Sequence, residues 1–368
     1  MQGCVLLALL MGLLAAATLQ AATAADDPGL DVRFDTLLRF EYSDARAPEA
    51  EDFLGSRTRL GLLYGKQRAF SLFGEVQYVL VTGLSENANA ASALYRGDTA
   101  SGMGDTNEAL KLSQLWAEVK PLTTVSLRLG RQPISMGGVT TYPEAHWNYL
   151  KKARLGERLV GRNGGSYGVR SYDGISGLFD FEGYDLHLFA AQPTTGVFAI
   201  RTGLEQQKDV LVAAADLTMR RGTGPQNTEA RAFLLGYSDT RNPAAVGGLF
   251  GDIQVYTLGG SLLGVYPMES GRLDALLWGA YQFGTYTDAI SNGSRELDHN
   301  AWALIAETGY QFVSLPMTPW VRTGINTASG DDNPGDDVHR TFFNALPSNF
   351  FYYGMANQVT FQNLVNWF

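Results

Sequence analysis

Six basic side chains crowd into one short stretch of an otherwise acidic chain. Between His146 and Arg170 they face a single acidic residue, Glu157, which gives a local net charge of +5. The whole chain carries -9, so the residues outside this stretch carry -9 - 5 = -14. A guanidinium binds a carboxylate through two parallel hydrogen bonds, and rings of Arg and Lys select anions in pores. The stretch therefore predicts binding or passage of an anionic compound. The six are Lys151, Lys152, Arg154, Arg158, Arg162 and Arg170.

Further arginines lie where apolar and polar residues alternate at period two, the pattern of a half-buried β-strand. Successive side chains of a strand point to opposite faces, so these arginines would point away from their apolar neighbours, toward an interior. Strand parity alone would turn Arg131 outward, but it lies at the rim of its strand, where parity often fails. All five are candidates for a substrate pathway: Arg57, Arg59, Arg128, Arg131 and Arg322.

A structural role is the alternative for every one of these cations. Charged loops are commonly just solvated, and an interior arginine is often paired with a carboxylate that braces the wall. On spacing, Arg33 with Asp35 and Arg39 with Glu41 are predicted to be such pairs.

Strand signals recur from end to end. In residues 273–284 one face holds Leu277, Tyr281 and Phe283, and the other holds Trp278 and Gln282. Aromatic residues near both ends of a strand are typical of one that crosses two headgroup layers. Interpreted in this way, the sequence predicts about fourteen strands. They are residues 30–42, 57–65, 70–82, 110–120, 124–132, 167–180, 184–192, 210–220, 229–238, 252–266, 272–286, 300–312, 320–327 and 356–368.

The connections between these strands alternate in length. Long ones at residues 43–56, 83–109 and 133–166 alternate with short ones at residues 66–69 and 121–123, and the later connections continue the series more mildly. Tight turns on one rim and long loops on the other are the rule in outer-membrane barrels, whereas a soluble sandwich has no such requirement. We expect an all-β fold, an antiparallel transmembrane β-barrel in contact with outer-membrane lipid.

The first residues indicate export. An apolar run from Cys4 to Thr18 precedes small residues at Ala22 and Ala24, which predicts a signal peptide at residues 1–24 and a single barrel domain at residues 25–368. Cys4 is the only cysteine, so disulfides cannot stabilise the exported chain. The expected location is the bacterial outer membrane, and the net charge of -9 argues against nucleic acid as a partner.

Two other chemistries are less well supported by the sequence. The loop from Asp331 to Asp337 offers hard oxygen ligands for Ca²⁺, but it lacks the spacing of an EF-hand, so a solvated acidic turn is the better interpretation and no cofactor is expected. None of the four histidines stands at a recognisable motif spacing from a Ser, Asp or Glu, so an enzyme is not expected.

Several short motifs occur in a characteristic order: LRLGRQ at 127–132, GERLVG at 156–161, RSYDG at 170–174, ASGDDNP at 328–334, TFFNALP at 341–347 and YYG at 352–354. Together they resemble the alginate export family of outer-membrane barrels. The resemblance implies a monomeric barrel of about eighteen strands with an electropositive lumen that passes a uronate polysaccharide. It assigns the motif arginines Arg128, Arg131, Arg158 and Arg170 to that lumen. About fourteen strands here would mean a smaller barrel or a chain truncated at its C-terminus.

The leading hypothesis is a porin or export channel for an anionic small molecule or a polyuronate, to which periplasmic secretion partners could dock. One alternative is a barrel with a plugged lumen that acts as a surface-binding protein. Another is an outer-membrane barrel hydrolase. Conductance separates them, because a plugged barrel would carry no anion-selective current.

Overall fold

The computed structural model describes residues 29–43, 51–66, 68–84, 95, 106–241, 252–288, 295–348 and 362–368. The predicted signal peptide, residues 1–24, lies outside these residues. The chain divides into two compact units, which are taken one at a time below. Unit 1 comprises Met1–Pro133, Gly164–Asp173 and Thr194–Glu205, and unit 2 comprises Ile134–Asn163, Gly174–Pro193 and Gln206–Phe368.

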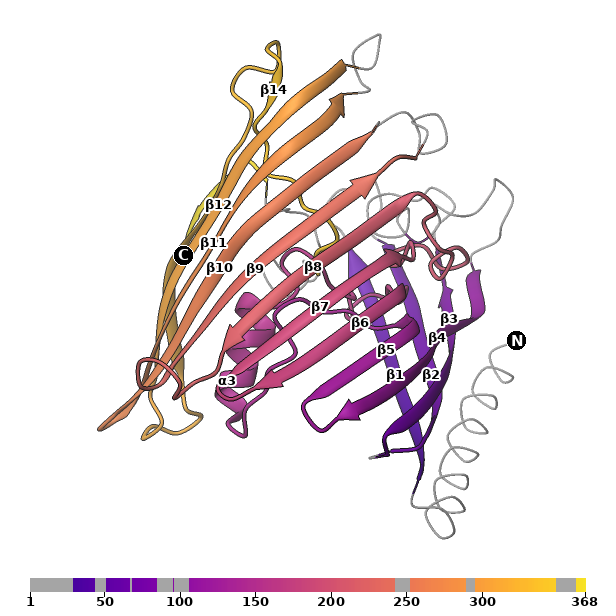
Figure 1. Cartoon of the computed structure of the whole chain (residues 1–368), viewed down its shortest axis with the longest axis horizontal. Helices are drawn as coiled ribbons and strands as arrows, with labels where there is room; N and C mark the ends of the chain where they lie inside the picture. The colour runs from indigo at the N-terminus through magenta and orange to yellow at the C-terminus, as the bar shows by residue number, and fades with distance from the viewer. Residues whose placement is uncertain are drawn as a thin grey trace. The chain divides into compact units, whose positions relative to one another are not determined.

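Unit 1 is built from five strands that follow one another in chain order, each antiparallel to the next (Figure 1). The turn between the second and third of these strands is short and contains Gly65. Gly65 has a positive φ of 78°, a conformation that glycine adopts without steric cost. The strands are β1 (Leu30–Ser43), β2 (Glu51–Tyr64), β3 (Phe70–Thr82), β4 (Thr106–Leu122) and β5 (Val125–Gln132).

Unit 2 continues in the same way and adds a short helical segment. The first two residues of β6 belong to unit 1. The strands of unit 2 are β6 (Tyr172–Phe181), β7 (Tyr184–Pro193), β8 (Val210–Met219), β9 (Thr228–Asp239), β10 (Ile253–Met268), β11 (Gly271–Asp288), β12 (Arg295–Gln311), β13 (Trp320–Ala328), β14 (Val338–His339) and β15 (Leu364–Trp367). The strand β15 pairs with β13, and β14 pairs in parallel with Asp298 and His299 near the start of β12. The helical segment is α3 (Ala145–Leu150) followed directly by a π-helical turn, η1 (Lys151–Leu155).

The predicted fold class is confirmed. Among the described residues, fourteen strands follow one another in chain order, β1 to β13 and then β15, and β14 lies off this path. Several local predictions were wrong. Residues 133–166 contain α3 and η1 rather than loop alone, and β6 begins at Tyr172 rather than at residue 167. The second error arises because Gly168 bridges to Val197 instead of to a strand neighbour.

The alternation of connection lengths holds with one exception. Residues 289–294, between β11 and β12, were predicted to belong to a longer loop, but these two strands stay paired as far as Asp288 and Arg295. Their link is therefore shorter than the turn at residues 312–319 that follows β12.

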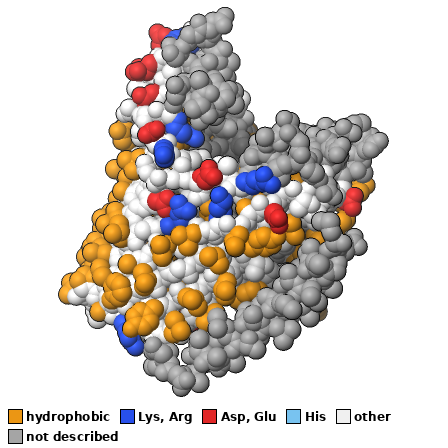
Figure 2. All heavy atoms as spheres, turned by 90° about the vertical axis from the view of Figure 1, so that its right-hand side faces the viewer, with side chains coloured by type: hydrophobic (Ala, Val, Ile, Leu, Met, Phe, Trp, Pro, Cys, Tyr) orange, Lys and Arg blue, Asp and Glu red, His pale blue; other side chains and the backbone are white. Residues whose placement is uncertain are grey.

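The two faces of the strands differ as the period-two pattern predicts. On β11, Leu277, Tyr281 and Phe283 are exposed, whereas Trp278 and Gln282 are buried. Figure 2 shows hydrophobic side chains gathered in a broad band over one face of the molecule, with most charged side chains to one side of it. A band of this kind is typical of strands that face lipid. We call the face with the exposed hydrophobic side chains the apolar face, and the opposite one the covered face.

The apolar face gives a first test. The substitution Leu277→Arg places a charge in the middle of β11 on this face, and a charge at the bilayer midplane costs about 2–4 kcal/mol. We expect the free energy of unfolding in phospholipid vesicles, measured by urea titration, to fall by about that amount. The matched control is Met317→Arg in the turn at residues 312–319, where the side chain is 97% exposed. Equal unfolding free energies for the two variants would rule out a lipid-facing apolar face.

Candidate functional site

The part of the basic stretch that ends at Asn163 belongs to unit 2 and lies on its covered face (Figure 1). Its helix α3 follows Pro143 and Glu144, where the backbone is still extended. Trp147 and Leu150 are buried, and Leu155 follows them on the buried side of η1. The π-turn closes with a hydrogen bond of 2.6 Å from the Gly156 N–H to the Lys151 carbonyl. Wide turns of this type often occur at functional sites.

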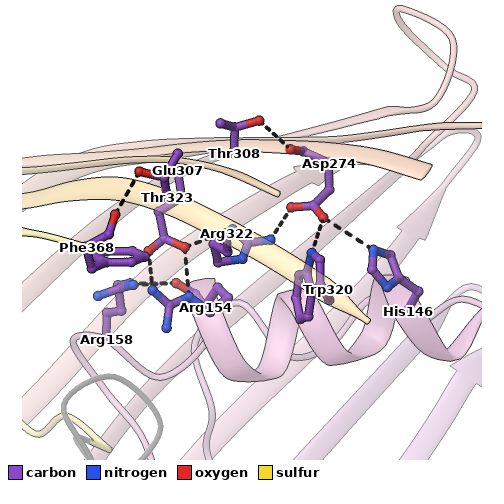
Figure 3. A network of polar contacts seen from close by, with 10 residues as sticks. All are labelled: His146, Arg154, Arg158, Asp274, Glu307, Thr308, Trp320, Arg322, Thr323 and Phe368. Carbon is purple, nitrogen blue, oxygen red and sulfur yellow. Dashed lines mark hydrogen bonds and ion pairs between the residues drawn. The ribbon is translucent and has the colours of Figure 1, made fainter. Parts of the chain in front are cut away.

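We call Ile134–Asn163 the segment. Arg154 joins the segment to the sheet through a carboxylate of β12 (Figure 3). Its Nε and Nη2 donate to the two oxygens of Glu307 at 2.8 and 2.5 Å. Arg322 of β13 donates to the same carboxylate at 2.9 Å and to Asp274 of β11. The side chains of both acids are 0% exposed. Glu307 thus lies between two guanidiniums and Arg322 lies between two carboxylates, so two positive charges balance two negative ones.

A glycine makes the Arg322–Asp274 contact possible. Gly309 of β12 lies between these residues, opposite each of them in the register of the sheet. A Cβ atom at Gly309 would lie 2.9 Å from Asp274 Oδ2 and 3.1 Å from Arg322 Nη2. Asp274 Oδ2 accepts a hydrogen bond of 3.1 Å from Trp320 Nε1, and His146 Nε2 of α3 lies 3.5 Å from the same oxygen. Asp274 therefore connects α3 to β11 and β13.

Arg158 follows the same turn and is buried. Its Nε and Nη2 donate to the carbonyl oxygen of Arg154 at 2.9 and 2.5 Å. Its guanidinium also lies 5.9 Å from the centre of the Trp278 ring. Of its basic neighbours in the sequence, Lys152 is exposed and Arg162 is half-buried.

Lys151 makes a second ion pair between the segment and the sheet. Its Nζ lies 2.7 Å from Glu229 Oε2 on β9, and the Tyr142 hydroxyl donates to the same oxygen at 2.6 Å. Burial lowers the pKa of Lys151, and the charge of Glu229 opposes that shift. Burial raises the pKa of Tyr142, so its hydroxyl remains a donor. The pair is thus held as a salt bridge in a desolvated site.

Backbone and hydroxyl donors of the segment complete its attachment. The Gly137 N–H donates to Asp216 Oδ2 on β8 at 2.9 Å, and Arg231 of β9 donates to both oxygens of that carboxylate. The Thr140 hydroxyl donates to Asp185 on β7 at 2.7 Å. The anions therefore come from the strands and most of the donors come from the segment.

The segment keeps a surplus of positive charge. Residues 134–163 hold five Lys and Arg side chains and two acidic ones, which gives 5 - 2 = +3. Lys151 and Arg154 are each paired with a carboxylate of the sheet. The covered face of unit 2 is therefore crossed by a segment that carries net positive charge.

In unit 1 the predicted pathway arginines also contact carboxylates and carbonyls. Arg59 donates to Asp35, its direct partner in the register of β1 and β2, at 2.8 and 3.0 Å. Arg57 donates to the carbonyl oxygens of Gly164 and Ser166 at 3.0 and 2.5 Å. The two Arg57 contacts hold the loop at Gly164–Asp173 against β2.

The remaining unit 1 candidates are Arg128, Arg131 and Arg170. Arg128 donates to Glu118 at 2.7 Å, and its guanidinium lies 3.9 Å from the centre of the Trp116 ring. Arg131 makes two hydrogen bonds to Asp173, at 2.7 and 2.8 Å. Arg170 is buried, with 7% of its surface exposed.

One of the two predicted bracing pairs is confirmed, and the other was wrong. Arg39 donates to Glu41 at 2.9 Å, as expected. The pair of Arg33 with Asp35 was wrong: Asp35 lies directly opposite Arg59 and binds it, and Arg33 lies 3.8 Å from Asp31. Register across strands decided this pairing, whereas spacing along one strand did not.

The carboxylates that hold the segment were missed in the sequence. They are Asp185, Asp216, Glu229, Asp274 and Glu307. The signal that could have found them was their position: each falls on the covered parity of its strand, where an unpaired charge is costly and a partner must exist.

Two further sequence hypotheses can be compared with the structure. In the loop from Asp331 to Asp337, Asp336 accepts hydrogen bonds from Arg340 at 2.9 and 3.0 Å, and no metal-binding cluster of His, Cys, Asp and Glu is found among the described residues. The Val338 N–H and Arg340 hold the pKa of Asp336 below its usual value. In the described part of the chain, no helix has the length and apolar character to span a membrane.

A family model described as Alginate export matches residues 30–367. The chain belongs to the alginate export family. The resemblance carried by the six sequence motifs is thus confirmed. No curated protein sequence matches the chain.

Three solved structures are similar to this chain at low identity. Pseudomonas aeruginosa OccK9 (OpdG) is 13% identical with a TM-score of 0.43, over 84% of this chain and 83% of that one. Pseudomonas aeruginosa OccK11 (OpdR) is 12% identical with a TM-score of 0.43, over 88% and 68%. Pseudomonas putida OprB is 11% identical with a TM-score of 0.39, over 82% and 85%.

Replacement of Glu307, whose carboxylate binds both Arg154 and Arg322, tests how the segment is attached. In Glu307→Gln, Arg154 and Arg322 lose their buried counter-charge, and loss of one partner of a buried ion pair costs about 3–5 kcal/mol. We expect the free energy of unfolding, followed by tryptophan fluorescence in vesicles during urea titration, to fall by that amount.

The control for this variant is Glu296→Gln, on the same strand but exposed. Exposed charges contribute about 0–1 kcal/mol, so this variant should unfold like the native protein. If both variants were equally stable, Glu307 would not hold the segment.

Proposed function

We propose that the protein is an outer-membrane channel for an anionic small molecule or a uronate polysaccharide. Membership in the alginate export family supports a channel rather than an enzyme. The observation that supports an anionic substrate is the net charge of +3 on the segment Ile134–Asn163. This segment lies on the covered face of a sheet whose other face is apolar.

In this proposal the predicted cations form the wall of the pathway. They are Arg57, Arg59, Arg128, Arg131, Lys151, Lys152, Arg154, Arg158, Arg162, Arg170 and Arg322. Those that are paired with carboxylates contribute a weakened field. Conduction needs binding that is favourable enough for entry and weak enough for release. Ion pairing of part of the wall supports that balance, while the segment Ile134–Asn163 as a whole keeps its net charge of +3.

The proposal includes the expected processing and placement of the chain. Residues 1–24 are removed as a signal peptide, and residues 25–368 function as one monomeric barrel domain in outer-membrane lipid. Short connections such as residues 123–124 and 269–270 face the periplasm, where a secretion partner could dock.

A plugged surface-binding barrel is the second candidate. The observation that favours it is the number of contacts that hold the segment to the sheet, because a fixed segment could close a pathway as well as line it. The two candidates differ in whether current flows.

Reversal potentials in planar bilayers test the channel. We expect the native chain to conduct with a preference for chloride over potassium. In the variant with Lys152→Gln, Arg158→Gln and Arg162→Gln, the ratio of the two permeabilities should fall by about fivefold. That corresponds to about 1 kcal/mol, the interaction of two charges ~4 Å apart in water.

The control replaces three cations away from the segment, Lys66, Arg68 and Lys208, by glutamine and should keep the native ratio. Heat-modifiable migration on gels shows that each variant is folded. An absence of current from a folded native chain would favour the plugged barrel, and equal ratios in both variants would contradict the role of the segment.

A further inference from the structure

Two histidines from separate parts of unit 2 meet where β14 pairs with β12 (Figure 1). His299 and His339 are partners in the parallel register, and their Nδ1 atoms lie 3.0 Å apart. His299 is buried, with 3% of its surface exposed. Imidazole is the side chain whose ordinary charge change falls between pH 5 and 8, so the stability of this contact can depend on pH in that range.

Hydrogen bonds to Gln282 of β11 fix the protons of the histidine pair. Gln282 Nε2 donates to the Phe343 carbonyl at 2.9 Å, and the Phe343 N–H donates to Gln282 Oε1 at 2.8 Å, so only one orientation of the amide satisfies both. His299 Nε2 lies 3.2 Å from Gln282 Oε1 and must donate to this acceptor. The Nδ1 atom of a neutral His299 is then an acceptor, and His339 Nδ1 donates to it.

A proton on His299 breaks this contact. When His339 alone is protonated, its Nδ1 still donates and the hydrogen bond between the rings stays in place. When His299 gains a proton at Nδ1, two N–H groups point at each other across 3.0 Å, and a positive charge lies in a buried site. The pair therefore holds together only while His299 is neutral.

The groups that face the pair from β11 and β12 are uncharged. The Tyr286 ring of β11 stacks on the His339 ring, with 4.0 Å between ring centres and an interplanar angle of 11°. On β12, Leu297 and Ala301 share the parity of His299 and are buried. These neighbours exclude water and offer no counter-charge to a protonated ring.

The charged residues beside β14 are paired with one another. Asp336 accepts hydrogen bonds from Arg340 at 2.9 and 3.0 Å, and Asp337 lies 3.8 Å from Arg295. On β12, Asp298 is exposed on the parity opposite to that of the histidine. A charge gained by the histidine pair is therefore not balanced by these carboxylates.

The pair holds one end of residues 338–348, which we call the strap. At its other end the strap binds the segment, because the Leu346 N–H donates to the Leu159 carbonyl at 2.8 Å. Between the two ends, Phe342 is 0% exposed. The strap therefore connects the histidine pair to the positively charged segment on the covered face.

From this arrangement we infer that the His299–His339 pair is an acid-sensitive switch, which holds the strap on the sheet at neutral pH and releases it when His299 gains a proton. The inference rests on the proposed channel function only for its consequence. The strap binds the segment that lines the proposed pathway, so its release changes the conductance of that pathway.

The site lies beyond the lipid-facing part of β12, because Glu296 and Asn300 on the outward side are polar and exposed, whereas exposed hydrophobic side chains begin at Trp302. Burial, and in addition the facing His339 ring, lowers the pKa of His299 to about 4, and release returns it to the ordinary value of about 6.5. The held state is therefore fully favoured above pH 6.5 and loses stability as the pH falls from there toward 4. In this window each pH unit raises the ratio of released to held strap about tenfold.

The test is amide hydrogen exchange of the full chain in phospholipid vesicles at pH 7 and pH 5, followed by mass spectrometry. The readout is the protection factor, which corrects for the pH dependence of the chemical exchange step. We expect protection of the strap amides to fall about thirtyfold between the two pH values, while the amides of β9 keep theirs. An ordinary carboxylate gains its proton near pH ~4, so this range reports on histidine.

Two variants assign the change to the pair. His299→Gln removes the group whose protonation breaks the contact, and the double variant with His299→Gln and His339→Gln removes both titrating rings. In each, we expect the protection of the strap to become nearly independent of pH. The matched control is His187→Gln, which replaces a buried histidine on β7 and should keep the native change. Heat-modifiable migration on gels shows that each variant is folded.

The outcomes separate the switch from the channel. Equal protection of the strap at pH 7 and pH 5 in the native chain overturns the switch, even where anion-selective current is present. A fall that persists unchanged in the folded double variant also overturns it, because other groups then titrate. A fall that depends on His299 in a chain that carries no current supports the switch and contradicts only the proposed channel.

Discussion

Buried carboxylates on the covered face of unit 2 are the constraint on which the rest of this structure depends. Glu307, Glu229 and Asp216 each lie on a strand with little or no exposure, and a buried charge without a partner costs several kcal/mol. The sheet alone does not satisfy them all. Arg154 and Lys151 supply the missing charges and Gly137 supplies a backbone donor, all from one segment. Attachment of that segment is therefore required by the strands themselves.

This requirement changes how the positive charge of the chain is understood. Lys151 and Arg154 are structural in the sense that their charges satisfy carboxylates of the wall. The bracing role and the anion-directed role, which are alternatives for a single arginine, thus coexist in one segment: Lys151 and Arg154 hold it in place, and its net charge is +3. A bare ring of arginines would bind a polyanion more strongly and release it more slowly.

The sequence predicted what depends on local pattern. Period-two alternation identified Leu277 as outward and Trp278 as inward, since strand geometry fixes parity residue by residue. It missed α3, because six residues are too few for a clear helical period. It also missed that Arg154 binds Glu307, because these residues are 153 positions apart and nothing local encodes which strand the segment crosses.

Hydrogen exchange of the amides of Trp147 to Gly156, in the protein embedded in vesicles, tests the central claim most directly. If the carboxylates of the sheet hold the segment, these amides exchange about as slowly as those of β9 and β12, and they become fast when Glu229 and Glu307 are both replaced by glutamine. Fast exchange in the native protein, at the rate of an exposed loop, would contradict the account.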